Sequence, residues 1–207
     1  MARAGTPPQP FQGGRTLDDL PLFPLHAVLF PGGRLPLRIF EQRYMEMAKG
    51  CLRDGAPFGV CLILEGKEVG EPAVPAEVGC LARLSSWDMP QLGVLQVVAL
   101  GKQRFRVLSQ RAQPDGLLRA CVALLDEPDS DVPPQLGCVR LMERILEEHP
   151  TLFERPWRLD SAAWLTGRLA EVLPLPLALK QELLECDADA RLARLTALLR
   201  SIPSAPA

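Results

Sequence analysis

Three structural signals follow one another in the stretch LPLFPLHAVLFPGGRLPLRIFEQRY, residues 20–44. The apolar run Ala27–Phe30 predicts a short strand that ends at Pro31-Gly32. Proline presets φ and glycine accepts a positive φ, so this pair suits the second and third positions of a type II turn. Beyond the turn, apolar residues alternate with arginine and proline over residues 34–39. This period of two predicts a strand with one buried face and one face in water.

A helix is predicted over residues 41–53, directly after that strand. Glu41 suits its N-terminus because the positive end of the helix dipole stabilises a carboxylate. With Glu41 as the N-cap, Phe40 and Met45 fall at the two positions of a hydrophobic staple. Asp54-Gly55 predicts the end of the helix, since glycine readily adopts the left-handed conformation that closes a helix.

Four pieces of the opening stretch, LPLFPL, VLFPG, LPLRIFE and RY, occur in an order that is characteristic of one protein family. The order resembles the start of the N-terminal substrate-binding domain of Lon proteases, and especially the small stand-alone proteins built from that domain. The resemblance covers residues 17–201 through FGV (58–60), EVG (68–70), GKQRFRV (101–107), DGLLRA (115–120), KQELLE (180–185) and RLARL (191–195). It implies a module that binds polypeptides and a β-barrel of the PUA-like kind.

Strand signals continue from Val78 to Asp126 without a helical period. Gly101 interrupts what would otherwise be one very long strand, which predicts a bulge or a bend there. So many short strands favour a closed or nearly closed small barrel, because closure removes exposed strand edges. The strands expected are Cys80–Trp87, Gly93–Leu100, Arg104–Gln110 and Leu117–Leu125, in addition to a buried strand at Phe58–Leu64.

The segment EPDSDVPP, residues 127–134, separates two kinds of sequence pattern. Its prolines and acids cannot continue a strand, and beyond it the apolar residues recur at helical spacing. We therefore expect an α+β protein with a PUA-like small β-barrel over residues 17–126, a linker, and a C-terminal helical bundle over residues 135–202. The Pro- and Gly-rich residues 1–16 are expected to form a disordered lead-in.

The composition indicates a globular chain without a membrane span. Hydrophobic residues make up 47% of the 207 residues, and the formal net charge of −2 is too balanced to indicate a nucleic-acid partner. No apolar run reaches the ~18 residues that cross a bilayer. The six cysteines contain no CxxC pair and lie mostly in apolar segments, which indicates buried thiols. We expect a reducing, cytoplasmic location and neither a metal nor another cofactor.

Catalytic signatures are absent from the sequence. It contains no phosphate loop of the form GxxxxGK[ST] and no GxSxG serine motif. His26 and His149 are the only histidines, and structural positions at a strand end and a helix end are expected for them. Full-length Lon proteases add ATPase and protease modules that do not follow here, so we expect a non-enzymatic protein. An unrecognised hydrolase would need a pocket where serine or cysteine meets one of the histidines.

Lys102, Arg104 and Arg106 form the most notable local pattern. Their spacing of two predicts that all three lie on one face of a strand. The simpler interpretation is a solvated outer face of the barrel, with the arginine stems covering apolar surface. The other interpretation is a recognition strip for acidic peptide segments or for an RNA backbone, since PUA-like barrels include RNA binders.

Two smaller groups complete the candidate binding residues. Arg34, Arg38 and Tyr44 lie near the opening strand, where Glu41 is expected to pair with Arg38 or with a later arginine. Trp87 and Met89 lie beside proline and leucine in a region that could anchor a peptide. The function expected is the binding of exposed apolar polypeptide or of a protein partner, in a groove between barrel and helices or along a strand edge. RNA binding through the basic strip is the alternative.

Overall fold

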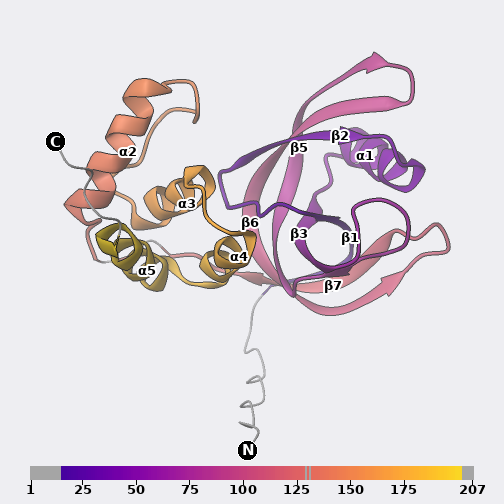
Figure 1. Ribbon diagram of the computed structural model, residues 1–207. Coiled ribbons are helices and arrows are strands. Elements are labelled where there is room, and N and C mark those ends of the chain that lie inside the picture. Colours follow the sequence, from indigo (N-terminus) through magenta and orange to yellow (C-terminus); the bar gives the residue numbers. More distant parts are fainter. Residues whose placement is uncertain (1–14, 129, 131, 202–207) are drawn as a thin grey trace, which may run out of the picture.

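The computed structural model describes residues 15–128, 130 and 132–201, and it has two parts that lie side by side (Figure 1). One part contains all the strands and helix α1 (Gln42–Asp54), and the other contains helices α2 to α5. The predicted lead-in lies outside the described residues except for Arg15 and Thr16, and Thr16 begins the first strand. The α+β class with barrel strands followed by helices is confirmed.

The sheet closes into a ring of five strands. Each strand in the order β1, β7, β6, β5 and β3 pairs with the next, and a parallel pairing of β3 with β1 completes the ring. Strand β2 pairs with β6 only, and short β4 pairs with β3. The bounds are β1 Thr16–Leu25, β2 Arg34–Ile39, β3 Phe58–Glu65, β4 Val74–Pro75, β5 Val78–Gln91, β6 Val94–Ala112 and β7 Leu118–Leu125.

Two predicted strands turn out to be one. Both predicted ranges, Gly93–Leu100 and Arg104–Gln110, fall in β6 except for Gly93, which lies in the turn before it. β6 continues through a register shift opposite Cys80 and Ala82 instead of ending there. The bulge predicted at Gly101 is therefore present. A Cβ atom at Gly101 would overlap with the carbonyl oxygen of Phe30, so glycine allows the turn that follows Phe30 to lie against β6.

The turn at Pro31-Gly32 is confirmed, but the short strand before it is wrong. Gly32 has a φ of 78°, and the amide of Gly33 donates to the carbonyl oxygen of Phe30 at 2.9 Å. Ala27–Phe30 form no strand, because this segment crosses from the end of β1 to the turn without a pairing partner among the described residues.

Strand β2 and helix α1 follow the predicted pattern. Along β2, Arg34, Pro36 and Arg38 are exposed while the alternate residues are partly or fully buried. Helix α1 has Glu41 as its N-cap residue and closes at Gly55 with φ 61°. Phe40 is 57% exposed, so it contributes little burial to the expected staple.

The helical part consists of α2 (Leu136–Glu148), α3 (Ala162–Val172), α4 (Leu177–Glu185) and α5 (Ala188–Ser201). Ser161 caps α3, since its hydroxyl accepts a hydrogen bond from the amide of Trp164 at 3.1 Å, and Asp187 caps α5 through the amide of Ala190. Apolar residues of these helices share one core with Val28, Phe30, Leu62, Ala76 and Val78 from the barrel. The helices are therefore packed onto the barrel. None of the helices in the described ranges is long and apolar enough to cross a membrane.

Candidate functional site

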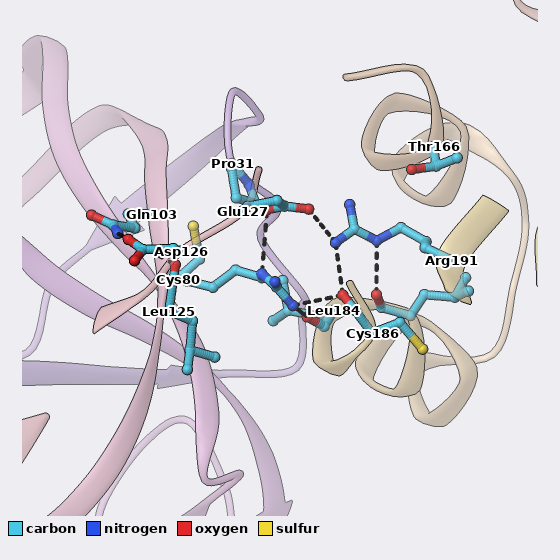
Figure 2. A network of polar contacts seen from close by, with 12 residues as sticks. Pro31, Cys80, Gln103, Leu125, Asp126, Glu127, Thr166, Leu184, Cys186 and Arg191 are labelled. Atoms are coloured by element: carbon cyan, nitrogen blue, oxygen red, sulfur yellow. Dashed lines mark hydrogen bonds and ion pairs between the residues drawn. The ribbon is translucent and has the colours of Figure 1, made fainter. Parts of the chain in front are cut away.

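A buried ion-pair network joins the barrel to the helices (Figure 2). Arg104 on β6 and Arg191 on α5 both pair with the carboxylate of Glu127, which directly follows β7 and Asp126. The Nε of Arg104 lies 3.2 Å from this carboxylate, and the exposed fractions of the side chains are 4% for Arg104, 1% for Arg191 and 12% for Glu127. We call these three residues the seam network.

The same two arginines satisfy the open carbonyl end of α4. Nη1 of Arg104 donates to the carbonyl oxygens of Leu184 and Cys186 at 2.8 and 2.6 Å, and Nε of Arg191 donates to that of Leu183 at 2.9 Å. The last carbonyls of a helix have no partner within the helix and carry its negative end, so cations stabilise them. The network thus binds α4 to both β6 and α5.

The basic strip predicted for Lys102, Arg104 and Arg106 is wrong as a shared outer face. Arg104 is buried in the seam network, Lys102 is exposed, and Arg106 is half-exposed and lies 3.7 Å from the carboxylate of Glu77. The bulge between Gly101 and Arg104 disturbs the alternation, and the helices cover β6 where Arg104 emerges.

A cavity of about 710 Å³ lies between the barrel and the helical part. Most of its lining is apolar, and Leu152 and Leu177 within it are 38% and 37% exposed. We call it the seam groove, lined by His26, Ala27, Val28, Leu29, Arg34, Leu35, Ile145, Glu148, His149, Leu152, Phe153, Glu171, Val172, Leu177 and Lys180. Arg34, one of the predicted binding residues, lies here and pairs with Glu154 at 2.5 Å.

Glu171 gives the seam groove a titratable group. Burial raises the pKa of its carboxyl to about 7, although Nη1 of Arg168 lies 2.9 Å away and lowers it. Nη2 of Arg168 donates to the carbonyl oxygen of Pro31 at 2.8 Å, and a Cβ atom at Gly33 would overlap with the Glu171 carboxylate. Arg168 and Glu171 of α3 therefore hold the turn between β1 and β2.

A second cavity, of about 380 Å³, continues from the seam groove, because Ala27 and Leu35 line both. We call it the strand groove, lined by Phe23, Leu25, Ala27, Leu35, Pro36, Leu37, Arg38, Ile39, Phe40, Glu41, Tyr44, Glu68 and Val69. Successive residues of a strand point to opposite faces, so the lining by residues 35–39 in succession places this groove along the edge of β2.

The predicted residues Arg38 and Tyr44 line the strand groove together. Arg38 is exposed, whereas the ring of Tyr44 is buried and stacks on Phe23 with 4.2 Å between the ring centroids. Burial raises the pKa of the Tyr44 hydroxyl. Glu41 pairs with Arg43 at 3.1 Å, so the ion pair expected at Glu41 is made with the later arginine.

Trp87 and Met89 lie apart from both grooves, on the β5–β6 hairpin, which extends beyond the other strands at the upper right of Figure 1. Their exposed fractions are 62% and 40%, and Leu92 at the tip is 93% exposed. The predicted binding residues are therefore distributed over two connected grooves, the hairpin and the seam, instead of forming one site.

The hydrolase alternative requires a pocket where serine or cysteine meets one of the histidines. His26 and His149 both line the seam groove, but the groove's described lining contains neither serine nor cysteine. His149 is the residue that ends α2, as expected. Burial raises the pKa of the Cys80 thiol to about 12 and raises that of Cys61 further, which keeps both unreactive. Among the described residues, no group of three or more His, Cys, Asp or Glu side chains could hold a metal ion.

The family profile of the ATP-dependent protease La (LON) substrate-binding domain matches residues 19–201. The chain belongs to this Lon substrate-binding domain family. The crystal structure of a Lon N-terminal domain protein from Xanthomonas campestris superposes with a TM-score of 0.72 and 39% sequence identity, covering 87% of this chain and 98% of that one. The resemblance found in the sequence is thereby confirmed.

Two longer relatives match part of the chain. Protein cereblon of Danio rerio is 29% identical over 147 residues, which are 66% of this chain and 33% of cereblon. Lon protease of Anaeromyxobacter dehalogenans is 27% identical over 177 residues, which are 80% of this chain and 21% of that protease. The chain thus spans a third or less of the length of these relatives.

Proposed function

We propose that this Lon substrate-binding domain protein is a non-enzymatic, cytoplasmic module that holds extended, partly apolar segments of polypeptide in the seam groove and the strand groove. The observation that carries the proposal is the connection of the two grooves through Ala27 and Leu35. Together they provide a longer apolar path than either does alone. The family description supports the proposal, because the substrates of a protease are polypeptides.

Exposed apolar side chains along the path supply a driving force. Phe40 and Val69 are 57% and 52% exposed in the strand groove, and Leu152 and Leu177 are more than a third exposed in the seam groove. Covering about 200 Å² of such surface would contribute about 5 kcal/mol, before the cost of ordering the bound segment is subtracted. Association alone costs about 4 kcal/mol or more, so this apolar surface supports only weak, reversible binding.

The backbone of β2 supplies a second attraction. β2 pairs with β6 along one edge, and no described strand pairs with its other edge. An extended peptide can form main-chain hydrogen bonds to a free edge while its alternate side chains enter pockets. Pro36 lacks an N–H group and is typical of an edge strand, so it limits uncontrolled pairing without closing the edge.

Binding to one model protein in two states tests the proposal. A reduced, carboxymethylated model protein, which stays unfolded, and the same protein in its native disulfide-bonded form are titrated with this protein, and fluorescence anisotropy is recorded. We expect saturable binding to the unfolded form and none to the native form. Negligible binding to both forms would refute the proposal.

Matched substitutions locate the binding surface. Leu177→Glu places a charge in the seam groove at a position already 37% exposed, and Val69→Glu does the same in the strand groove. Leu108→Glu is the control, because Leu108 is 51% exposed on β6 and lines neither groove. We expect about tenfold weaker binding for each groove variant and an unchanged affinity for the control.

The β5–β6 hairpin supports a second candidate function, the docking of a protein partner. Trp87, Met89 and Leu92 expose three large apolar side chains on one projecting element. Aromatic and methionine side chains of this kind are enriched in interfaces. If the hairpin is the main binding element, Trp87→Ser should abolish binding and Leu177→Glu should leave it intact. If the grooves are the main binding element, Leu177→Glu should weaken binding and Trp87→Ser should leave it intact.

The alternative of RNA binding was motivated by a basic strip that includes Arg104. Because Arg104 is buried, that motivation no longer holds.

A further inference from the structure

A separate cavity of about 410 Å³ opens on the seam network, away from the residues that line the two grooves. We call it the cationic pocket, lined by Pro31, Lys102, Gln103, Arg104, Glu127, Arg158, Ser161, Ala163, Trp164 and Arg191. Its lining includes the first turn of α3, an 11-residue helix whose N-terminus carries partial positive charge. Glu127 is its only acidic lining residue in the described part of the chain.

Two buried guanidinium groups each keep one terminal nitrogen without a partner. Nη1 of Arg191 and Nη2 of Arg104 donate to no group in the described ranges, although both residues line the pocket. One terminal nitrogen of Arg191 accordingly carries no dashed line in Figure 2. Neither nitrogen is among the fully buried side-chain atoms that lack a partner, so solvent reaches both, although at most 4% of either side chain is exposed. An anion in the pocket could therefore accept hydrogen bonds from them.

The charge of the pocket is also only partly balanced. Arg104 and Arg191 share the single carboxylate of Glu127, with the carbonyl end of α4 as additional compensation. Lys102 and Arg158 add two exposed cations, and the ammonium group of Lys102 forms no hydrogen bond or ion pair with any residue the structure describes. Four cationic side chains and one acidic side chain therefore line the open volume of the pocket.

From this geometry we propose that the cationic pocket binds a phosphate group, either as free phosphate or as the phosphate monoester of a small molecule. The forked N–H groups of arginine match the oxygen geometry of phosphate, and lysine adds a mobile point charge. A dianion balances the excess positive charge more fully than a carboxylate can. Bound phosphate would connect β6, α5 and the first turn of α3, and so stabilise the seam.

Thermal unfolding in the presence of inorganic phosphate tests the site, with sodium chloride holding the ionic strength constant. At ten times the dissociation constant, phosphate should raise the midpoint temperature by about 3–6 °C. Glycerol 3-phosphate tests the monoester as a source, and acetate tests whether a carboxylate suffices. Isothermal titration calorimetry gives the dissociation constant directly.

Lys102→Ala and Lys67→Ala form the matched pair, because both remove an exposed lysine and only Lys102 lines the pocket. We expect Lys102→Ala to bind phosphate about tenfold more weakly and Lys67→Ala to bind it like the unaltered protein. Phosphate also stabilises proteins non-specifically by exclusion from their surface, and such an effect would be the same in both variants. The assignment would be overturned if the two variants responded equally to phosphate. It would also be overturned if phosphate raised the midpoint temperature no more than sodium chloride of the same ionic strength does, or if acetate raised it as much as phosphate does.

Discussion

Replacing Glu127 with glutamine tests whether the seam network holds the helices on the barrel. The substitution keeps the shape of the side chain but leaves Arg104 and Arg191 without their shared counter-charge. Removing one partner of a buried ion pair costs about 3–5 kcal/mol, because the remaining charge is buried without compensation. Glu127 is 12% exposed and glutamine can still accept a hydrogen bond, so we expect the free energy of unfolding to fall by about 3 kcal/mol, the lower end of this range.

The loss is measured by urea unfolding followed by circular dichroism, and by the thermal midpoint. For a domain of this size, 3 kcal/mol corresponds to about 6–12 °C. Glu77→Gln is the control, since Glu77 is 80% exposed and lies 3.7 Å from Arg106, a pair worth about 1 kcal/mol or less. A loss for Glu127→Gln no larger than that for Glu77→Gln would refute the reasoning.

Three further predictions concern single positions. Because burial raises the pKa of Glu171 to about 7, its contribution to stability is fully present below its ordinary pKa near 4.5 and is lost as pH rises through 7. Between pH 5 and pH 8, the free energy of unfolding measured in urea should therefore fall by on the order of 2 kcal/mol more for the unaltered protein than for Glu171→Gln. Parallel pH profiles of the two proteins would contradict this. Gly101→Ala should cost about 1–3 kcal/mol, since the new methyl group overlaps with the carbonyl oxygen of Phe30; a neutral result would mean that the turn can move away. Ser161→Ala should cost about 1 kcal/mol by removing the cap on the amide of Trp164, with Ser161→Asp as the variant that should retain stability.

The local features of the fold could be predicted from the sequence. The turn at Pro31-Gly32, the alternation along β2 and the N-cap at Glu41 each depend on the conformational preferences of a few neighbouring residues. Such preferences involve only residues close together in the sequence, so they can be predicted without knowing the rest of the structure. The order of family motifs in residues 20–44 supplied the remaining fold information.

Features that depend on distant pairing could not be predicted in the same way. The sequence pattern places Glu127 in a linker, yet its carboxylate pairs with Arg191, 64 residues further along the chain. Nothing in the pattern around Arg191 marks it as buried, since an arginine in an amphipathic helix is usually at the surface. The bulge at Gly101 was predicted, but its effect on which way Arg104 points depends on the register with β5.

Only part of the candidate site could be predicted from the sequence, because the rest also depends on contacts between distant residues. A groove between barrel and helices was expected, and Arg34, Arg38 and Tyr44 do line the two connected grooves. The sequence does not mark Leu152 and Leu177 as groove residues, because a leucine beside or within a helical segment usually belongs to the core, and only the packing leaves these two exposed.

Hydrogen–deuterium exchange with and without a saturating unfolded polypeptide tests the central claim most directly. If a segment lies along the free edge of β2, the backbone amides of residues 34–40 other than Pro36, and those of the loop near Leu152, should exchange more slowly in the complex. Amides around Leu108 should be unaffected, because that part of β6 lines neither groove. Protection confined to the β5–β6 hairpin around Trp87, or no protection on either groove at saturation, would contradict the account.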